Sequence, residues 1–218
     1  MILGIYGAGG LGREVYELAT IINSKDHRWD TIIFIDDSSN PDNPRNLTIN
    51  TFSEVKKISN MKDIEVCIAV GEPFVRETLY KRLDSDGIKM ATLIHPEVNI
   101  PESTQIGKGV IICKFVSITC DISIGMNVYI HPMACVGHDA TIGSHSVISS
   151  FVDVAGNCNV GKKAFLAINV ILKQGTSIGD DSIIGLASVV HRDIPSSVIA
   201  LGNPARPMKN NLDKKVFK

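Results

Sequence analysis

The chain has 218 residues, a formal net charge of −1 and 44% hydrophobic residues. Its basic residues are scattered, which argues against a surface for nucleic acid or another polyanion. No stretch reaches the roughly 18 uninterrupted apolar residues that a membrane helix needs, and the first residues lack the pattern of a secretion signal. The five cysteines form no CxxC pair, so we expect reduced thiols and not a disulfide framework. These features predict a cytoplasmic protein without membrane insertion or a nucleic-acid partner.

The first part of the chain, residues 1–87, predicts a Rossmann-like α/β half-domain. A buried strand runs into a glycine-rich turn of the form GxGxxG, and an amphipathic helix follows. Strand, glycine turn, helix and strand make a βαβ unit, whose strands are parallel. We expect strands at residues 2–7, 31–37, 63–71 and 89–95, and a second helix that starts at Pro73 and ends at Gly87.

From Ile88 to Val190 every sixth residue is aliphatic, over 18 consecutive positions. An α-helix does not produce a period of six, and a continuous flat strand does not turn every six residues. A second period of 18 lies over the first, because a glycine follows every third aliphatic from Ile106 onward. Short strands with a corner after each hexad explain both periods: three hexads close one triangular coil, and the aliphatics stack inside it. Residues 88–194 therefore predict an all-β parallel β-helix of between five and six coils, capped by a tail over residues 195–218.

The glycine turn, Gly7 to Gly12, is the first candidate binding feature. Its backbone N–H groups can approach a ligand, and the N-terminus of the following helix favours an anion. Asp36 follows Gly12 by 24 residues, about where dinucleotide-binding folds place a ribose-binding acid, and Asp37 adjoins it. The α/β part leaves no room for a second mononucleotide half, which favours a ligand smaller than NAD, such as a nucleoside diphosphate. A tight structural turn and a polar strand end are the alternatives.

Three histidines, His131, His138 and His145, follow one another at intervals of seven residues. Successive hexads lie on different faces of the coil, so the three side chains should point around three corners, and we expect no metal site. The 18-residue period places His138 between Cys120 and Gly156, and the missing side chain of Gly156 leaves space beside it. By its spacing alone, His138 is either a catalytic base or an exposed turn residue.

Several motifs together resemble one family of proteins. They are the hexapeptide repeat, the early IYGAGG and FIDD segments, GHD in a middle coil, and GNPAR near residue 206. The combination resembles the bacterial sugar acetyltransferases that include the sialic acid O-acetyltransferases and the bacillosamine-pathway N-acetyltransferases (NeuD/PglD-like). The resemblance covers nearly the whole chain. It implies a left-handed coil, a homotrimer with active sites between subunits, and acetyl-CoA as co-substrate.

The resemblance also implies roles for single residues. His138 stands where the N-acetyltransferases have a general base, and Asp139 where they have an acid, usually glutamate, that raises the basicity of the histidine. His131 is expected beside the acceptor or acyl site. The positions implied for the nucleotide sugar are Gly9, Gly10, Leu11, Asp36 and Asp37, although the family often has a histidine in place of Leu11. Those implied for acetyl-CoA are Gly156, Ile168, Leu186 and Arg206, with the Gly156 N–H as a candidate oxyanion donor.

The implied activity is acetyl-CoA-dependent N-acetylation of a nucleotide-linked 4-amino-4,6-dideoxy sugar for surface glycan biosynthesis. His138 would take a proton as the amine attacks the thioester directly. O-acetylation of sialic acid or a related sugar is the alternative within the family. From other classes, a nucleotide-binding regulatory module without catalysis and a purely structural trimeric solenoid stay open.

Overall fold

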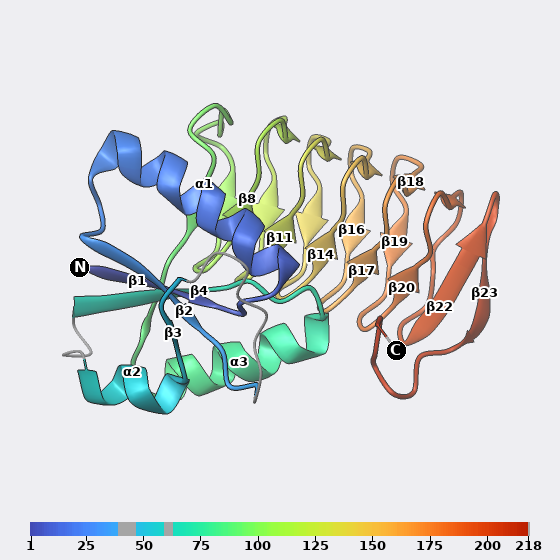
Figure 1. The fold of residues 1–218 in the computed structure, drawn as a ribbon. Helices are drawn as coiled ribbons and strands as arrows, with labels where there is room; N and C mark the ends of the chain where they lie inside the picture. Colours follow the sequence, from blue (N-terminus) through green and yellow to red (C-terminus); the bar gives the residue numbers. More distant parts are fainter. Residues whose placement is uncertain (39–46, 59–62, 218) are drawn as a thin grey trace.

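The computed structural model describes residues 1–38, 47–58 and 63–217, in which an α/β part is followed by a long triangular β-helix (Figure 1). The α/β part contains a parallel sheet with strand order β3-β2-β1-β4-β5. This is the half-domain that the βαβ pattern predicts. Its strands are β1 (Ile2–Tyr6), β2 (Thr31–Ile35), β3 (Ile49–Asn50), β4 (Ile64–Ile68) and β5 (Lys89–Met90). Its helices are α1 (Gly10–Asp26), α2 (Phe52–Ile58) and α3 (Pro73–Ser85).

The glycine turn brings α1 close to the end of β1. Gly7 has a φ of +110°, which a side chain would strain. At Gly12 an added Cβ would collide with the carbonyl oxygen of Gly7, so only glycine permits this approach. α1 then buries one stripe of side chains at helical spacing: Val15, Leu18, Ala19 and Ile22.

The segment from Lys89 to His95, predicted as one strand, is two. β5 pairs with β4 in the first sheet, whereas β6 (Leu93–Ile94) pairs with the first complete coil of the β-helix. The prediction was wrong here because the chain passes from one sheet to the other within this segment. Ile88 is correspondingly buried in the core of the α/β part and does not belong to the stack of the β-helix. The division of the chain at residue 87 stays a prediction.

The hexad period corresponds to three sheets that meet along three edges, as in a left-handed β-helix, and their strands are parallel except for the last one, β23 (Figure 1). We call them the covered face, the second face and the third face, in the order in which the chain visits them. The covered face contains β6, β8 (Ile111–Ile112), β11 (Tyr129–Ile130), β14 (Val147–Ile148), β17 (Phe165–Leu166), β20 (Ile183–Ile184), β22 (Val198–Gly202) and β23 (Ala205–Asn210). The second face contains β9 (Ser117–Ile118), β12 (Cys135–Val136), β15 (Asp153–Val154), β18 (Ile171–Leu172) and β21 (Val189–Val190). The third face contains β7 (Gln105–Ile106), β10 (Ser123–Ile124), β13 (Thr141–Ile142), β16 (Asn159–Val160) and β19 (Ser177–Ile178).

From β6 to β21, each strand of the β-helix pairs with residues 18 positions away, as the double period requires. Ile130, for example, pairs with Ile148, and both side chains are fully buried in the core of the β-helix. The glycines of the 18-residue period lie on the edge between the third and covered faces. A Cβ on Gly143 would come within 2.5 Å of the backbone of Gly161 in the next coil, so close stacking excludes a side chain there.

The corners have a feature that the period did not reveal. Nearly every sixth residue has a left-handed backbone, for example Asn127 (φ +54°), Asp139 (φ +58°) and Asn157 (φ +57°). Asn and Asp tolerate this conformation better than most residues, which explains why they recur at these corners.

The α/β part packs on the covered face. The outward side chains of that face, among them Tyr129, Val147 and Phe165, join the hydrophobic cluster that contains Val15 and Leu18 of α1. This packing fixes the glycine turn above the middle coils of the β-helix.

Arg76 of α3 joins the two parts and is fully buried. Its guanidinium donates hydrogen bonds to the carbonyl oxygens of Ile68 and Val70 and to the carbonyl and side-chain oxygens of Asn127 in the β-helix, at 2.7–3.0 Å. Burial lowers the pKa of Arg76 to about 10. Carbonyl oxygens thus take the place of a carboxylate partner around this cation.

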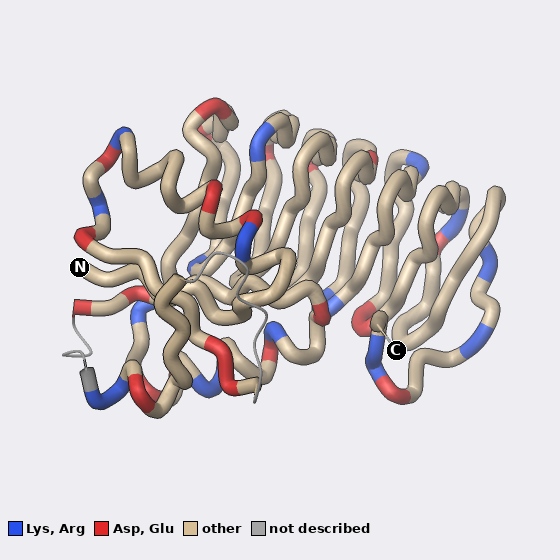
Figure 2. The backbone as a smooth tube through the Cα atoms, in the orientation of Figure 1, with Lys and Arg blue, Asp and Glu red and all other residues tan. Residues whose placement is uncertain are grey.

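Charged residues lie mainly on the α/β part and at the corners and ends of the β-helix, with no concentration of one sign (Figure 2). All five cysteines are free thiols. Among the described residues, no helix has the length and apolar character to cross a membrane.

Candidate active site

His138 and Asp139 form a hydrogen-bonded pair on the edge between the second and third faces. The Nδ1 of His138 lies 2.7 Å from Oδ2 of Asp139. The left-handed backbone of Asp139 turns its carboxylate back toward the preceding ring. A carboxylate only accepts, so this contact places the proton of a neutral imidazole on Nδ1 and leaves the Nε2 lone pair free. Both side chains are about half exposed, so the pair is open to a ligand from outside the coil.

The ring of His138 lies directly against Gly156 in the next coil. A Cβ added to Gly156 would come within 2.5 Å of Nε2 and 2.7 Å of Cε1. The space beside His138 that the 18-residue period predicted is therefore occupied by the ring itself. Gly156 sets the position of the imidazole because it has no side chain.

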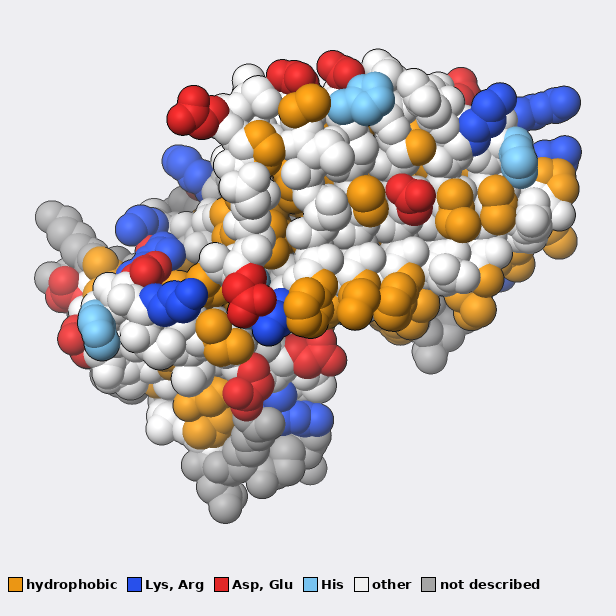
Figure 3. Space-filling view, turned by 90° about the horizontal axis from the view of Figure 1, so that it is seen from above, with side chains coloured by type: hydrophobic (Ala, Val, Ile, Leu, Met, Phe, Trp, Pro, Cys, Tyr) orange, Lys and Arg blue, Asp and Glu red, His pale blue; other side chains and the backbone are white. Residues whose placement is uncertain are grey.

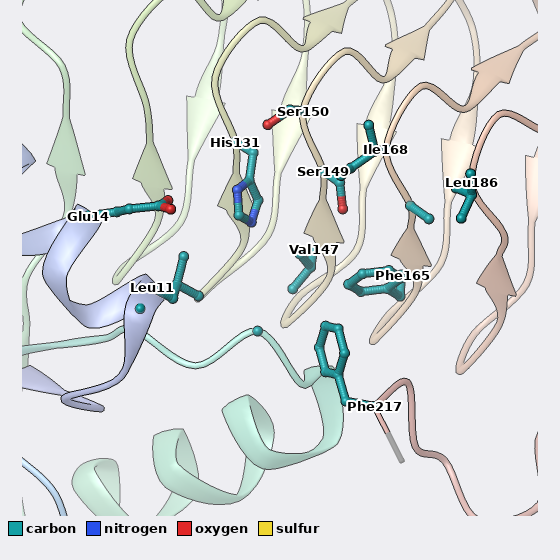
Figure 4. A pocket seen from close by; sticks show the side chains of 13 residues that line it. Leu11, Glu14, His131, Val147, Ser149, Ser150, Phe165, Ile168, Leu186 and Phe217 are labelled. Atoms are coloured by element: carbon teal, nitrogen blue, oxygen red, sulfur yellow. The ribbon is translucent and has the colours of Figure 1, made fainter. Parts of the chain in front are cut away.

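A pocket of about 560 Å³ lies between the glycine turn and the covered face, at the edge that this face shares with the second face (Figure 4). It brings together five of the predicted site residues, from the two parts of the chain. These are Gly10 and Leu11 of the glycine turn and His131, Ile168 and Leu186 of the β-helix. The remaining lining residues are Glu14, Gly71, Val147, Ser149, Ser150, Phe165, Ala167 and Phe217.

His131 lies in the wall of this pocket and stays neutral. Its ring packs on Tyr129, with centroids 4.3 Å apart. Burial, with a smaller contribution from the charge of Arg76, lowers the pKa of His131 to about 4. His131 can therefore offer a hydrogen-bond donor or acceptor to a ligand without a charge at neutral pH.

The two acids after β2 are engaged within the chain. Asp36 accepts the backbone N–H of Ala8 in the glycine turn, at 2.8 Å. Asp37 accepts the hydroxyl of Tyr6 and forms an ion pair with Arg82, both at 2.6 Å. The pKa of each carboxyl is lowered because these hydrogen bonds outweigh the desolvation of the acid. Asp36 thus links the glycine turn to the end of β2, whereas Asp37 links the end of β2 to Tyr6 of β1 and to Arg82 of α3.

The predicted site residues divide between two edges of one chain. Ile168 and Leu186 border the pocket, but His138 and Gly156 lie on the next edge and do not. Arg206 is exposed on β23 and forms no ion pair among the described residues. The three histidines occupy three different corners, as predicted, and the described residues include no group of His, Cys, Asp and Glu that could hold a metal ion.

Sequence reasoning missed several residues of the pocket, above all Glu14, Ser149, Phe165 and Phe217. Phe165 and Ser149 could have been found, since both lie on the covered face or its edge one coil away from Val147 and His131. Phe217 follows β23 and reaches the pocket only through the folding of the chain, so no spacing pointed to it.

Comparison with known proteins agrees with this architecture. Residues 3–83 match the PglD N-terminal domain. The acetyltransferase domain of PglB from Neisseria gonorrhoeae is 26% identical with a TM-score of 0.88, over 95% of this chain and 99% of that one. WeeI from Acinetobacter baumannii is 26% identical with a TM-score of 0.87, over 95% and 100%. PerB from Caulobacter crescentus, in complex with CoA and GDP-perosamine, is 26% identical with a TM-score of 0.83, over 95% and 97%. No curated protein sequence matches the chain.

A β-helix of hexapeptide repeats behind a PglD-type domain, with a His–Asp pair on one edge, defines the class of this protein as an acyltransferase. More narrowly, residues 3–83 match the PglD N-terminal domain, and the chain is similar along nearly its whole length to the PglB acetyltransferase domain and to WeeI.

Proposed function

We propose that this enzyme transfers an acetyl group from acetyl-CoA to the amine of a nucleotide-linked 4-amino-4,6-dideoxy sugar, in the biosynthesis of a surface glycan. The observation that carries the proposal is the His138–Asp139 pair, held against Gly156 with Nε2 free. The similar proteins support it, since PerB was solved with CoA and GDP-perosamine and the PglB domain with acetyl coenzyme A.

The pair provides the proton transfer that this reaction needs. As the amine attacks the thioester carbonyl, Nε2 of His138 takes the proton of the amine, and Asp139 stabilises the resulting imidazolium through Nδ1–H. The tetrahedral oxyanion accepts a hydrogen bond from a backbone N–H, for which Gly156 is the candidate. When the C–S bond breaks, the leaving thiolate of CoA receives the proton from Nε2. No covalent enzyme intermediate is required.

The acceptor binds at the glycine turn. The N-terminus of α1 faces the diphosphate through Gly9 and Gly10, while Leu11 and His131 face the sugar. Asp36 supports this turn by accepting the backbone N–H of Ala8, and we assign it to the nucleoside of the acceptor. We assign Asp37, which lies just after β2, to the same nucleotide-sugar site.

Acetyl-CoA lies along the edges of the β-helix. Ile168 and Leu186, which are 57% and 75% exposed, offer apolar contact to the pantetheine arm, and Arg206 offers a cation to the phosphates. Gly156, on the neighbouring edge, brings the thioester next to His138.

Because the pocket and the pair lie on different edges, a homotrimer is needed to bring them together. The edge beside the pocket carries an exposed apolar column, Phe115, Met133 and Phe151, with one residue from each successive coil. Figure 3 shows exposed hydrophobic side chains in rows along the β-helix. Burial of such a column against a second copy places the His138 edge of one subunit beside the pocket of its neighbour.

The acceptor is tested with a panel of substrates. Thiol release from acetyl-CoA is measured with UDP-, dTDP- and GDP-linked 4-amino-4,6-dideoxy sugars and with free sialic acid, and products are identified by mass. We expect an N-acetylated nucleotide sugar from one of the first three and a loss of about 10²–10⁴-fold in kcat for His138→Ala. Acetylation of sialic acid alone would make the enzyme an O-acetyltransferase, and unchanged turnover in His138→Ala would exclude the proposed base.

A further inference from the structure

The segment that follows β23, residues 211–217, returns from the far coils to the α/β part. We call it the strap. The strap begins at Asn211. The backbone N–H of Asn211 donates to the carbonyl oxygen of Ser197, and its side-chain amide donates to the carbonyl oxygen of Asp181. Further along, Lys214 forms an ion pair with the side chain of Asp181 at 3.4 Å. The strap is thus tied to the β-helix before it crosses to the α/β part.

Glu72 holds the other end of the strap. Its carboxylate accepts the backbone N–H groups of Val216 and Phe217, at 3.0–3.1 Å. Glu72 directly precedes α3, so its negative charge also lies at the positive end of that helix. Hydrogen bonds to a charged acceptor are stronger than neutral ones, which makes Glu72 an effective anchor.

This anchor places Phe217 in the wall of the pocket (Figure 4). Its ring meets Phe165 edge to face, with centroids 5.6 Å apart and an interplanar angle of 84°. On the other side it passes Gly71, where a Cβ would stand 3.4 Å from the ring and 3.8 Å from Leu11. Phe165 is almost fully buried, whereas Phe217 is 61% exposed. The exposed surface of Phe217 is therefore available for a ligand that enters between the strap and the glycine turn.

We infer that Phe217 is an acceptor-binding residue, held in place by Glu72, whose ring packs against the sugar of the nucleotide sugar. The inference rests on the proposed function for the identity of the ligand. The pocket wall is apolar at Leu11, Val147, Phe165 and Phe217. Such a wall suits the C–H face of a deoxy sugar, while the diphosphate lies at the N-terminus of α1. Glu72 touches no ligand and acts as a positioning residue.

The test measures binding and turnover separately. The Kd of each nucleotide sugar in the panel is measured by titration calorimetry without CoA, and KM and kcat are measured for acceptor and for acetyl-CoA. For Phe217→Ala we expect the Kd and KM of the acceptor to rise about tenfold or more, because an exposed aromatic contact is lost. The KM of acetyl-CoA should stay within about twofold, and Phe217→Tyr should restore acceptor binding.

The role of Glu72 is tested by hydrogen exchange and a double variant. Glu72→Gln should remove the protection of the Val216 and Phe217 amides and weaken acceptor binding, and Glu72→Gln combined with Phe217→Ala should bind no worse than Phe217→Ala alone. Leu212→Ala, in the same strap but 85% exposed and outside the pocket, is the matched control and should match the wild type.

The outcomes separate the inference from the proposed function. If an acceptor is acetylated and Phe217→Ala binds it as tightly as the wild type does, the role of Phe217 is refuted and the proposed function stands. Acceptor binding without CoA release, weakened by Phe217→Ala, would refute the acetyl transfer but keep the ligand contact. If no nucleotide sugar binds the wild-type protein, both fall.

Discussion

The imidazole of His138 rests on the backbone of Gly156, one coil further along the β-helix. The 18-residue repeat brings these two positions together, and the absence of a side chain at Gly156 leaves room for the ring. Asp139 completes the arrangement through its contact with Nδ1, in a coil whose register is set by stacked aliphatic residues. The geometry of the proposed catalytic base therefore depends on the same period that forms the fold.

Substitution of Gly156 by alanine should displace the ring of His138. The new Cβ would come within 2.5 Å of Nε2, which forces the imidazole out of its position. We expect kcat to fall by about 10²–10³-fold, approaching the contribution of a positioned base. The double variant with His138→Ala should be no slower than His138→Ala alone, as measured by CoA release. Full activity in Gly156→Ala would show that the position of the ring does not matter.

A charge in the apolar column should break the trimer. Phe151 is 55% exposed and lies between Met133 and the later coils on the edge beside the pocket. Phe151→Glu would place a carboxylate in the proposed interface, where its desolvation is costly. Light scattering should report a trimer for the wild type and smaller species for Phe151→Glu. Met208→Glu, on β23, should leave the mass unchanged; a monomeric wild-type protein would contradict the proposed assembly.

Removal of the buried arginine should destabilise the whole chain. Arg76→Met leaves the carbonyl oxygens of Ile68, Val70 and Asn127 without their donor and separates the α/β part from the β-helix. We expect a loss of about 3–5 kcal/mol in the free energy of unfolding, typical of removing one partner from a buried charged network. Urea denaturation measures the loss, with the exposed Arg192→Met as the control. An unchanged midpoint for Arg76→Met would show that the two parts are held together by other contacts.

Stability should fall as the pH drops from about 6.5 toward 4. Burial lowers the pKa of His145 to about 4, from 6.5 in an unfolded chain. Burial also lowers the pKa of His131 to about 4. Between these values the unfolded chain binds more protons than the folded one, so the free energy of unfolding rises with pH across this window and levels off above it. His145→Gln should reduce that slope in urea titrations at several pH values, whereas His191→Gln, at an exposed position, should not. Equal slopes for both variants would argue against a neutral buried His145.

Most of the fold could be predicted because a period constrains many residues at once. The spacing of the aliphatics predicts the β-helix, its register and the position of His138 beside Gly156. The sequence could not show where the chain leaves one sheet for another, so the strand at Lys89–His95 was merged and Ile88 was assigned to the wrong core.

The candidate site was only partly predictable. Residues related by the period, such as His138 and Gly156, can be placed together, but contacts between the α/β part and the β-helix cannot. The pocket depends on how the glycine turn packs over Val147 and Phe165, and its last wall, Phe217, comes from a segment that crosses the molecule. No local pattern reports such a packing.

We propose that the His138–Asp139 pair of one subunit acts at the pocket of another, and complementation between two inactive variants is the test of this arrangement. His138→Ala removes the base. Gly10→Trp blocks the pocket at a position where a Cβ meets nothing closer than 3.9 Å. The two variants are denatured, mixed in equal amounts and refolded, and CoA release is measured with the acceptor identified in the panel. If sites form between subunits, about one quarter of them regain an intact pocket and an intact base, and activity returns to about that fraction of the wild type. If each chain forms its own site, the mixture stays as inactive as its two components, and the account is wrong.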